Sequence, residues 1–497
     1  VVTVDGVQKY GGGFPGEKTH DGNFCCDGLV FADRSFKAGT LEAKAAYQPI
    51  RTDFDNGILT VYNRFDFTNL NEYELAYSID VDGVSIKTEV LNLDLMPHCT
   101  KQINIDFEEN DQGDILSTEA LRRNVMANSH EYDMYLLFDR IAFAAAQENL
   151  IADFDLLQYI DLNQPYWSQQ INDQITVNGK RFFAVGDENP VLLTGATVLF
   201  YSKDIASELQ LDDPYELVRN GKWTMERYYE MARSAIRDNG NAVWDINDRY
   251  GVVTNSGQYF SEFFMVSGVN AIAKDENDLP YFNALSDSRF ADIYDAVYRM
   301  TYDVKGMIFN VSTEDTSMYS FPDGYDNYQK ALALFGDGHA LFCGVAVSRA
   351  GVLRAYDLNY GVLPFPTYEE KPVGEAYSSR IGALVPYVIP SDATEEQLDR
   401  AAILLEALAC AGKNHVVNQY YNIVLSQKEA NGDPDSIEML DMVFNNRRVD
   451  LGDIYWQVCN QTIYDLLGQK AENYTSKLTS LEKSLNKQIQ KTLDIFS

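Results

Sequence analysis

The spacing of apolar residues changes character near residue 108. Before that point, short segments such as residues 58–67 and 101–107 partly alternate between apolar and polar positions and are rich in β-branched and aromatic residues. Such alternation is typical of strands with one buried face. We therefore expect residues 47–107 to form a small antiparallel sandwich of the immunoglobulin-like kind. The glycine-rich residues 1–46 should form an irregular arm before it.

A hairpin and a closing strand are expected within this sandwich. Two strand-like runs, residues 73–81 and 84–91, flank Asp82-Gly83, a dipeptide that favours a two-residue turn. Residues 101–107 either complete the sandwich or pair with a strand further along the chain, at residues 132–138. We predict the first arrangement, so that Ile103 and Ile105 pair within the sandwich.

After residue 108, helix-like and strand-like segments alternate, which indicates an α/β protein. Residues 117–125 are expected to form a helix, and the nearly continuous apolar run 132–138 resembles a strand buried in a parallel sheet. Residues 179–187 should form a strand that runs into a turn. Residues 197–204 should form a strand followed by a helix over residues 205–211.

Helix caps and one apolar stripe mark the remaining helices. Asp213, followed by Pro214, and Thr224 are expected N-caps of two short helices. Near the end of the chain, apolar residues recur every three or four positions. They are Leu478, Leu481, Leu485, Ile489 and Leu493. This spacing predicts a helix that docks through one face, because the stripe is too short for a stable coiled coil.

Composition narrows the classes of function. The chain has 497 residues and a net charge of −34, which excludes a protein that binds nucleic acid through phosphate contacts. Its length predicts two or three domains. We see no apolar run long enough to span a bilayer and no signal peptide at residues 1–10. Six cysteines lack the spacing of a zinc site and are expected to be free, mostly buried thiols.

The first segment resembles a known enzyme family. Tyr10-Gly11-Gly12, residues 23–34 and residues 42–44 are similar to the end of the catalytic barrel of β-galactosidases of glycoside hydrolase family two. In that family, the carbonyl of Phe24 and the side chain at position 27 would face a sodium ion. Position 27 is Asp27 here, where asparagine is usual. An aspartate oxygen can still serve as a ligand of a hard cation.

The resemblance does not extend to the catalytic residues of that family. Its acid/base glutamate and its nucleophilic glutamate lie upstream of the matching stretch. Retaining hydrolysis needs two carboxyl groups roughly 5 Å apart. Asp21, Asp27 and Asp33 are the available substitutes, but we interpret them as carboxylates of turns and strand ends. We expect no catalysis from this segment.

The second segment resembles a different family. Residues 200–204 and the run from Leu211 to Thr224 are similar to the sugar-type extracellular solute-binding proteins of bacterial ABC importers, which include the maltose-binding protein. Residues 331–344, 359–366 and 383–390 support this match in the expected order. The resemblance covers nearly all of residues 110–497.

This resemblance implies a two-lobed periplasmic-binding-protein fold. We assign residues 108–200 and 367–430 to lobe one, residues 201–366 to lobe two, and residues 431–497 to C-terminal helices that pack on the lobes. The chain would cross between lobes near residues 199–203 and return near residues 364–379. Lobe one would lack its first strand, because the galactosidase-like segment stands in its place, and this loss would leave apolar sheet edge uncovered.

The same resemblance implies a binding function without catalysis. The protein would bind a carbohydrate between its lobes, outside the cell or at its surface, and deliver it to the membrane subunits of an ABC permease. No cofactor is implied, and a monomer is expected. The alternative is a β-galactosidase fragment or fusion that lacks the catalytic glutamates.

Several residues are candidate ligand contacts because of their positions next to predicted strands and loops. Asp139 and Arg140 come after the apolar run 132–138 and match a loop that, in maltose-binding proteins, bonds sugar hydroxyls. The alternative for this pair is an exposed ion pair at a helix start. Tyr166 and Trp167 are candidates for stacking against a sugar face, or else anchor their loop on lobe one.

Four further residues complete the predicted set. Tyr259 follows a strand-to-helix turn, Tyr377 and Arg380 lie on the return crossing, and Trp456 lies in the C-terminal segment. Each would face the cleft between the lobes or, alternatively, pack in the core. Trp223 is expected to be structural.

Overall fold

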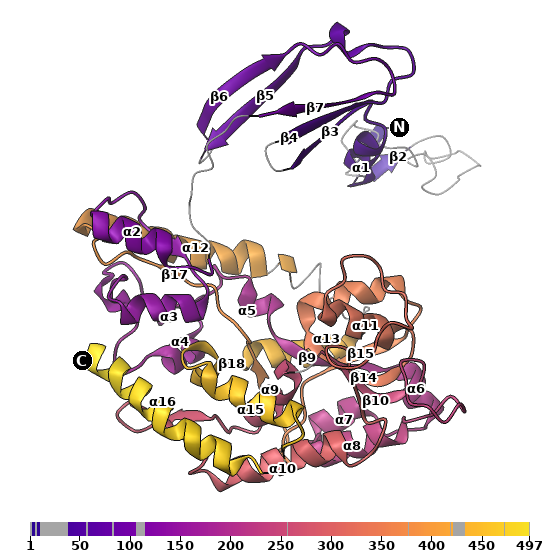
Figure 1. Cartoon of the computed structure of the whole chain (residues 1–497), viewed down its shortest axis with the longest axis vertical. Helices are drawn as coiled ribbons and strands as arrows, with labels where there is room; N and C mark the ends of the chain where they lie inside the picture. The colour runs from indigo at the N-terminus through magenta and orange to yellow at the C-terminus, as the bar shows by residue number, and fades with distance from the viewer. Residues whose placement is uncertain are drawn as a thin grey trace. The chain divides into compact units, whose positions relative to one another are not determined.

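The computed structural model describes residues 2–4, 7–9, 38–55, 58–81, 84–105, 115–255, 257–375, 377–417, 419–420, 433–471 and 473–496. The chain divides into two compact units, residues 1–111 and residues 112–497 (Figure 1).

The first unit consists mainly of antiparallel strands. Its strands are β1 (Val2–Val4), β2 (Val7–Lys9), β3 (Ile50–Asp55), β4 (Ile58–Asn63), β5 (Leu75–Val81), β6 (Val84–Leu91) and β7 (Thr100–Asn104). Its described residues also form a helix, α1 (Ala38–Ala46), and a 3-10 turn at Leu70–Glu72. The strands form a three-stranded sheet in the order β3-β4-β7 and two separate pairs, β1-β2 and β5-β6.

The pairing of β7 decides between the two arrangements considered for residues 101–107. Strand β7 pairs antiparallel with β4, and Ile103 lies opposite Leu59. The prediction that this strand completes the sandwich is confirmed, although residues 106–107 lie outside the described part. The hairpin is also confirmed, because β5 and β6 pair with Val81 opposite Val84.

The core of the first unit is small. Its buried members are Val61, Leu70, Leu93 and Leu95. The buried Asn63 amide donates hydrogen bonds to the carbonyl oxygens of Thr68 at 2.9 Å and Leu95 at 2.8 Å. One polar side chain therefore fixes two loops against the end of β4, where their carbonyl groups would otherwise lack donors.

The second unit is built around a five-stranded mixed sheet. The strands are β9 (Thr197–Ser202), β10 (Tyr250–Thr254), β13 (Ile308–Asn310), β14 (Ala340–Ala346) and β15 (Tyr360–Leu363). Their order is β13-β10-β14-β9-β15. Strand β9 runs antiparallel to both of its neighbours, whereas β10 is parallel to β13 and β14. All residues of β9 are buried, which explains its continuous apolar sequence.

Helices form much of the rest of the unit. They are α2 (Glu119–Ala127), α3 (Asp139–Gln147), α4 (Gln169–Ile175), α5 (Val191–Thr194), α6 (Lys203–Glu208), α7 (Pro214–Arg219), α8 (Met225–Ser234), α9 (Gly257–Val266), α10 (Ser288–Tyr302), α11 (Asn327–Gly336), α12 (Glu395–Ala411), α13 (Pro434–Asn445), α14 (Leu451–Ile454), α15 (Val458–Gly468) and α16 (Thr475–Ile495). Some of these helices pack beside the sheet and others, such as α2, α3 and α12, lie away from it (Figure 1). The side chains of Asp213 and Thr224 cap α7 and α8, as the sequence predicts.

Outside the five-stranded sheet, strand pairing is sparse in the described part of this unit. Strand β8 (Tyr135–Leu136) pairs with β17 (Tyr387–Val388), β16 (Ser379–Arg380) with β18 (Arg447–Arg448), and β11 (Ile272–Lys274) with β12 (Pro280–Phe282). Two sequence predictions are wrong here. The run 132–138 contributes only two strand residues, and they pair antiparallel; residues 179–187 form isolated bridges instead of a strand.

The reason for the short β8 lies at the end of the run. Phe138 is the N-cap residue of α3, so the backbone turns into a helix where a longer strand would continue. Leu137 donates its N–H to the carbonyl of Pro386 at 3.1 Å, and Phe138 donates to Ile115 at 2.8 Å. Only Tyr135 and Leu137 of this run are buried, and Leu136 is 41% exposed, so the run does not occupy a central strand of a sheet.

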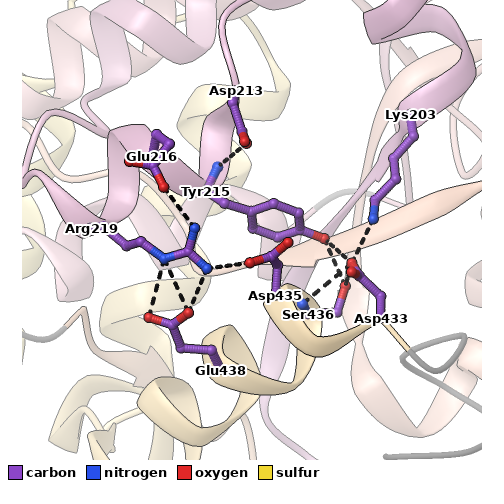
Figure 2. A network of polar contacts seen from close by, with 9 residues as sticks. All are labelled: Lys203, Asp213, Tyr215, Glu216, Arg219, Asp433, Asp435, Ser436 and Glu438. Carbon is purple, nitrogen blue, oxygen red and sulfur yellow. Dashed lines mark hydrogen bonds and ion pairs between the residues drawn. The ribbon is translucent and has the colours of Figure 1, made fainter.

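Helix α13 is attached to the second unit by a polar network that starts from α7 (Figure 2). The hydroxyl of Tyr215 donates to Asp433 Oδ2 at 2.6 Å and lies 2.8 Å from Ser436 Oγ. Lys203 Nζ contacts the same Asp433 oxygen at 2.6 Å. Arg219 holds a second cluster of carboxylates, from Glu216, Asp435 and Glu438.

Helix α16 packs through the predicted stripe. Leu478, Leu485 and Ile489 are buried in the core of the unit. Figure 1 shows the helix running from α10 toward α3, and at its far end Gln147 donates to the hydroxyl of Thr492 at 2.7 Å. Within the described residues, no helix has both the length and the apolar character that crossing a bilayer requires.

Candidate ligand-binding cavity

A cavity of about 550 Å³ lies within the second unit, where five segments meet. Its walls come from the start of α3, the end of β10, the start of α11, the segment from β16 to Ala383, and helices α14 and α15. The lining residues are Phe138, Arg140, Asn255, Tyr328, Arg380, Gly382, Ala383, Asp453, Gln457, Val458, Gln461 and Tyr464. This volume falls in the range of small-molecule sites.

Arg140 reaches the cavity from the first turn of α3. Its guanidinium carbon lies 4.4 Å from the centre of the Phe138 ring, an arrangement in which a cation lies over an aromatic face. Among the described residues, no carboxylate lies within ion-pair distance of the guanidinium. The side chain is half-buried, so its donors are available to a molecule in the cavity.

Asp139 points away from the cavity. Its carboxylate accepts the N–H of Leu384 at 2.6 Å and the N–H of Arg140 at 2.7 Å, and the residue is 1% exposed. Burial raises the pKa of Asp139 to about 7, against the opposing effect of these two hydrogen bonds. In this position Asp139 joins the start of α3 to the return segment at Leu384. This contact helps to hold the neighbouring Arg140 at the wall of the cavity.

Arg380 lies on β16 and forms the floor of the cavity with Asp453. Its Nε donates to Asp453 Oδ2 at 2.6 Å, and Tyr464 donates its hydroxyl to the other oxygen at 2.9 Å. The backbone N–H of Arg380 donates to Glu262 Oε2 at 3.2 Å. Its Nη1 has no hydrogen-bond partner within the part of the chain that the structure describes.

Two further carboxyl groups are buried beside this pair. Burial raises the pKa of Glu262 to about 8, while the positive charge of Arg380 acts in the opposite direction. Burial also raises the pKa of Asp450 to about 7, and the nearby Asp453 adds to this rise. Asp453 is therefore the carboxylate that directly neutralises Arg380, whereas the other two are partly protonated near neutral pH.

The side chains of Tyr166 and Trp167 are hydrogen-bonded to α12 and do not line the cavity. The Tyr166 hydroxyl donates to Glu406 at 2.5 Å, and the Trp167 indole N–H donates to the same carboxylate at 2.9 Å. Hydrogen bonding to Glu406 raises the pKa of Tyr166 to about 12. Trp167 is 3% exposed. This geometry corresponds to the alternative considered from the sequence, an anchor for the loop.

The other three aromatic candidates are in the core. Tyr259 shares a hydrogen bond of 2.7 Å with Tyr228, and Tyr377 accepts the backbone N–H of Trp223 at 3.2 Å. Trp456 is 2% exposed. The structure thus brings two of the predicted ligand contacts, Arg140 and Arg380, to one cavity and places the aromatic candidates elsewhere.

The candidate sodium residues Phe24 and Asp27 lie outside the described residues. Among the residues that are described, no group of three or more histidine, cysteine, aspartate or glutamate side chains is arranged to hold a metal ion.

Residues at the start of α15 form a wall of the cavity that was not predicted from the sequence. Gln457, Gln461 and Tyr464 line the cavity together, and they are spaced four and three residues apart. That spacing places them on one face of a helix, but Asn460, Thr462 and Asp465 on the same helix are also polar, so polarity alone did not single out this face. Asp453 stands three residues before the predicted Trp456, and its position gave no signal either.

Comparison with known proteins gives different relatives for the N-terminal part and for the larger remainder of the chain. The family described as β-galactosidase, domain 4, matches residues 59–132. The β-galactosidase of Priestia megaterium is 32% identical over 120 residues, which cover 23% of this chain and 12% of that enzyme. The β-galactosidase of Clostridium acetobutylicum is 35% identical over 121 residues, 23% of this chain and 13% of the enzyme. The chain thus spans about an eighth of the length of these relatives.

The family match extends beyond the predicted boundary at Phe107. It ends at residue 132, after α2. Helix α2 belongs to the second unit, where Leu121 is buried in the core and Arg122 pairs with Glu148. The similarity to β-galactosidases therefore overlaps the division between the units, which falls after Asp111.

Solved structures resemble the larger part of the chain. The sugar-binding protein MalE from Xanthomonas citri superposes with a TM-score of 0.53 at 14% identity, over 76% of this chain and 88% of that protein. An ABC substrate-binding protein from Listeria monocytogenes, solved with cycloalternan, gives a TM-score of 0.49 at 12% identity, over 78% of this chain and 91% of that one. The α/β part has the two-lobed fold of ABC solute-binding proteins. It follows a small β fragment that is similar to β-galactosidase domain 4.

Proposed function

We propose that the second unit binds a carbohydrate in the cavity lined by Arg140 and Arg380 and delivers it to an ABC permease, without catalysis. The observation that carries this proposal is the position of the cavity. It collects residues from the predicted lobe one, from the predicted lobe two and from α15, as expected for a site between two lobes. The MalE protein that shares the fold is described as sugar-binding.

The polar groups of the cavity suit such a ligand. Asn255, Gln457 and Gln461 provide amides that both donate and accept, and Tyr328 and Tyr464 provide aromatic surface with hydroxyl groups. A few convergent polar groups among aromatic side chains are the usual composition of a small-molecule site. The site would be placed outside the cell or at its surface, where a binding protein meets its solute.

The two lobes are part of the same proposal. Residues 108–200 with 367–430 would form lobe one, and residues 201–366 lobe two, with residues 431–497 packed on both. Ligand binding should then close the lobes around the cavity, a hinge motion on the microsecond to millisecond scale. Small-angle scattering should show a smaller radius of gyration with ligand than without, for a protein that remains a monomer.

Intrinsic fluorescence gives a direct binding test. All four tryptophans, Trp167, Trp223, Trp244 and Trp456, belong to the second unit, so excitation of tryptophan reports on that unit alone. A soluble library of neutral and acidic glycans should contain members that change the fluorescence and raise the melting temperature. If no glycan in the library does so, the carbohydrate proposal is wrong.

A matched pair of variants locates the site. Gln461 donates to Asp465 at 2.8 Å on the cavity side of α15, and Gln490 donates to Asp494 at 2.8 Å on the exposed face of α16. Both bonds join residues four apart on a helix, so Gln461→Ala and Gln490→Ala should have equally small effects on stability. Only Gln461→Ala should lower the affinity for the glycan, by several-fold.

The alternative function is glycoside hydrolysis, favoured by the similarity of residues 59–132 to β-galactosidase domain 4. We expect no turnover of a chromogenic galactoside, because no pair of catalytic glutamates was recognised in the sequence of this segment. Galactoside turnover above the blank would favour the alternative, provided that this activity copurifies with the protein.

A further inference from the structure

The cavity carries a positive charge in a strongly acidic protein. The chain has 74 acidic residues against 40 lysines and arginines, so an ordinary surface hollow should be lined by carboxylates. This cavity is lined by two arginines and one carboxylate, Asp453. That carboxylate is already bonded by Arg380 and by Tyr464.

Building on the proposed function, we infer that the carbohydrate carries an anionic group, a carboxylate or a sulfate ester, which Arg140 and Arg380 bind. The guanidinium fork matches the paired oxygens of such groups, and charge-assisted hydrogen bonds of this kind are among the stronger ones in proteins.

Arg380 supplies the first observation. The residue is 3% exposed and lines the cavity, yet its Nη1 has no hydrogen-bond partner in the described part of the chain. Buried guanidinium donors are nearly always satisfied, because leaving one without an acceptor is costly. Asp453 uses the Nε side of the guanidinium, which leaves Nη1 for an acceptor that arrives with a ligand.

Arg140 supplies the second observation independently. It comes from a different segment, and the described residues place no carboxylate within ion-pair distance of it. The ring of Phe138 lies beneath its guanidinium at 4.4 Å, which limits the orientations of the fork before any ligand arrives. The adjacent Asp139 is turned into the core, where two backbone N–H groups occupy its carboxylate.

The buried acids near Arg380 do not cancel this charge. Glu262 accepts the backbone N–H of Arg380 rather than its guanidinium. Burial raises the pKa of Glu262 to about 8 and that of Asp450 to about 7. Both groups therefore carry less than a full negative charge near pH 7, and Asp453 is the direct counterion of Arg380.

The test compares acidic sugars with neutral sugars of related structure. Trigalacturonate and α-1,4-linked galactotriose share their linkage and differ in the carboxylate at C6. In a second series, 3′-sulfolactose adds a sulfate ester to lactose, and 3′-sialyllactose adds a sugar residue that carries a carboxylate. The full chain is titrated with each sugar, followed by tryptophan fluorescence and calorimetry, alongside the library of neutral and acidic glycans. An acidic member should bind at least about tenfold more tightly than its neutral counterpart. Raising the salt should reduce that preference, and the two series distinguish carboxylate from sulfate.

Variants connect the preference to the arginines. Arg140→Gln should lower the affinity for the acidic sugar about tenfold or more and leave that for the neutral counterpart within a few-fold. Arg400→Gln is the matched control, because Arg400 is exposed and pairs with Asp133 and Glu396 away from the cavity. It should change neither affinity.

The outcomes separate this inference from the proposed function. If the glycans that bind are neutral, or bind as well without the acidic group, the inference is wrong and carbohydrate binding stands. If no glycan of either class binds, the proposed function fails and the inference with it. An acidic preference that survives Arg140→Gln unchanged would overturn the assignment to these two arginines.

Discussion

Arg380 and Asp453 form a buried ion pair with 2.6 Å between Nε and Oδ2, and their side chains are 4% and 7% exposed. The pair joins β16, on the return segment, to α14 in the C-terminal part of the chain. Asp453 also accepts from Tyr464 on α15. One carboxylate therefore connects three elements at the floor of the candidate cavity.

Removal of this carboxylate should destabilise the second unit. Asp453→Asn leaves the guanidinium of Arg380 buried without its counterion, a change that costs about 3–5 kcal/mol in buried pairs. Urea denaturation followed by tryptophan fluorescence should show a loss of this size, because all four tryptophans lie in the second unit.

The control is the same change at an exposed ion pair. Asp435 contacts Arg219 at the surface, with 44% of its side chain exposed. Asp435→Asn should lower the free energy of unfolding by less than about 1 kcal/mol. Equal effects for the two variants would show that the buried pair contributes no more than a surface pair.

The network in Figure 2 separates buried from exposed polar contacts on one helix. Tyr215→Phe removes the hydroxyl that contacts Asp433 and Ser436 in a largely buried position, so the free energy of unfolding should fall by about 1–2 kcal/mol. Arg219→Gln removes three ion pairs, but the side chain is 30% exposed and the loss should stay below about 1 kcal/mol.

Chemical denaturation of both variants measures this contrast. A larger loss for Arg219→Gln than for Tyr215→Phe would contradict it, and would mean that the carboxylate cluster attaches α13 more strongly than the tyrosine does.

The sequence predicted the fold better than the site because fold signals are local. The run from Leu211 to Thr224, which carries the resemblance to solute-binding proteins, is explained by contacts that build the structure. Asp213 caps α7, Trp223 donates its indole N–H to Pro364 at 2.9 Å, and Thr224 caps α8. Each of these roles depends on neighbours in the sequence or on one packing partner.

The cavity could be predicted only in part, because its residues come from five separate segments. Arg140 and Arg380 were found by their positions after a strand and on the crossing segment. The aromatic candidates were less informative, because the same residue types also fill the core, where Tyr259 and Tyr377 lie. No pattern in the sequence distinguishes a tyrosine that faces a ligand from one that bonds another buried group.

Gly221 shows how tightly the Leu211–Thr224 run is packed. Its φ is +69°, and a Cβ at this position would lie 2.0 Å from the carbonyl oxygen of Lys371. Gly221→Ala should therefore lower the free energy of unfolding by more than the roughly 1–2 kcal/mol that a left-handed backbone alone costs an alanine.

Gly338 provides the matched control. Its φ is +81°, and a Cβ there would have no atom within 4 Å. Gly338→Ala carries only the backbone cost, so the difference between the two variants measures the clash with Lys371. Similar melting temperatures for both would show that the segment around Lys371 moves aside without cost.

The buried carboxyl of Glu262 should make stability depend on pH. Its pKa rises from 4.5 to about 8, mainly because burial disfavours the charged form. The folded state therefore holds this proton where the unfolded state has released it. The stabilising contribution is complete below about pH 4.5 and is lost as the pH rises through about 8, with a slope of at most about 1.4 kcal/mol per pH unit.

Glu262→Gln isolates this contribution from those of Asp139 and Asp450, whose pKa values are also raised. The amide resembles the protonated acid and can still accept the N–H of Arg380. The variant should unfold with nearly the wild-type free energy at about pH 4 and should be increasingly more stable than the wild type as the pH rises from about 5 to 8. Exposed Glu396 gives the control Glu396→Gln, which should show no such divergence. Parallel curves for Glu262→Gln and the wild type would mean that Glu262 is already charged in the folded protein, with Arg380 shared between two carboxylates.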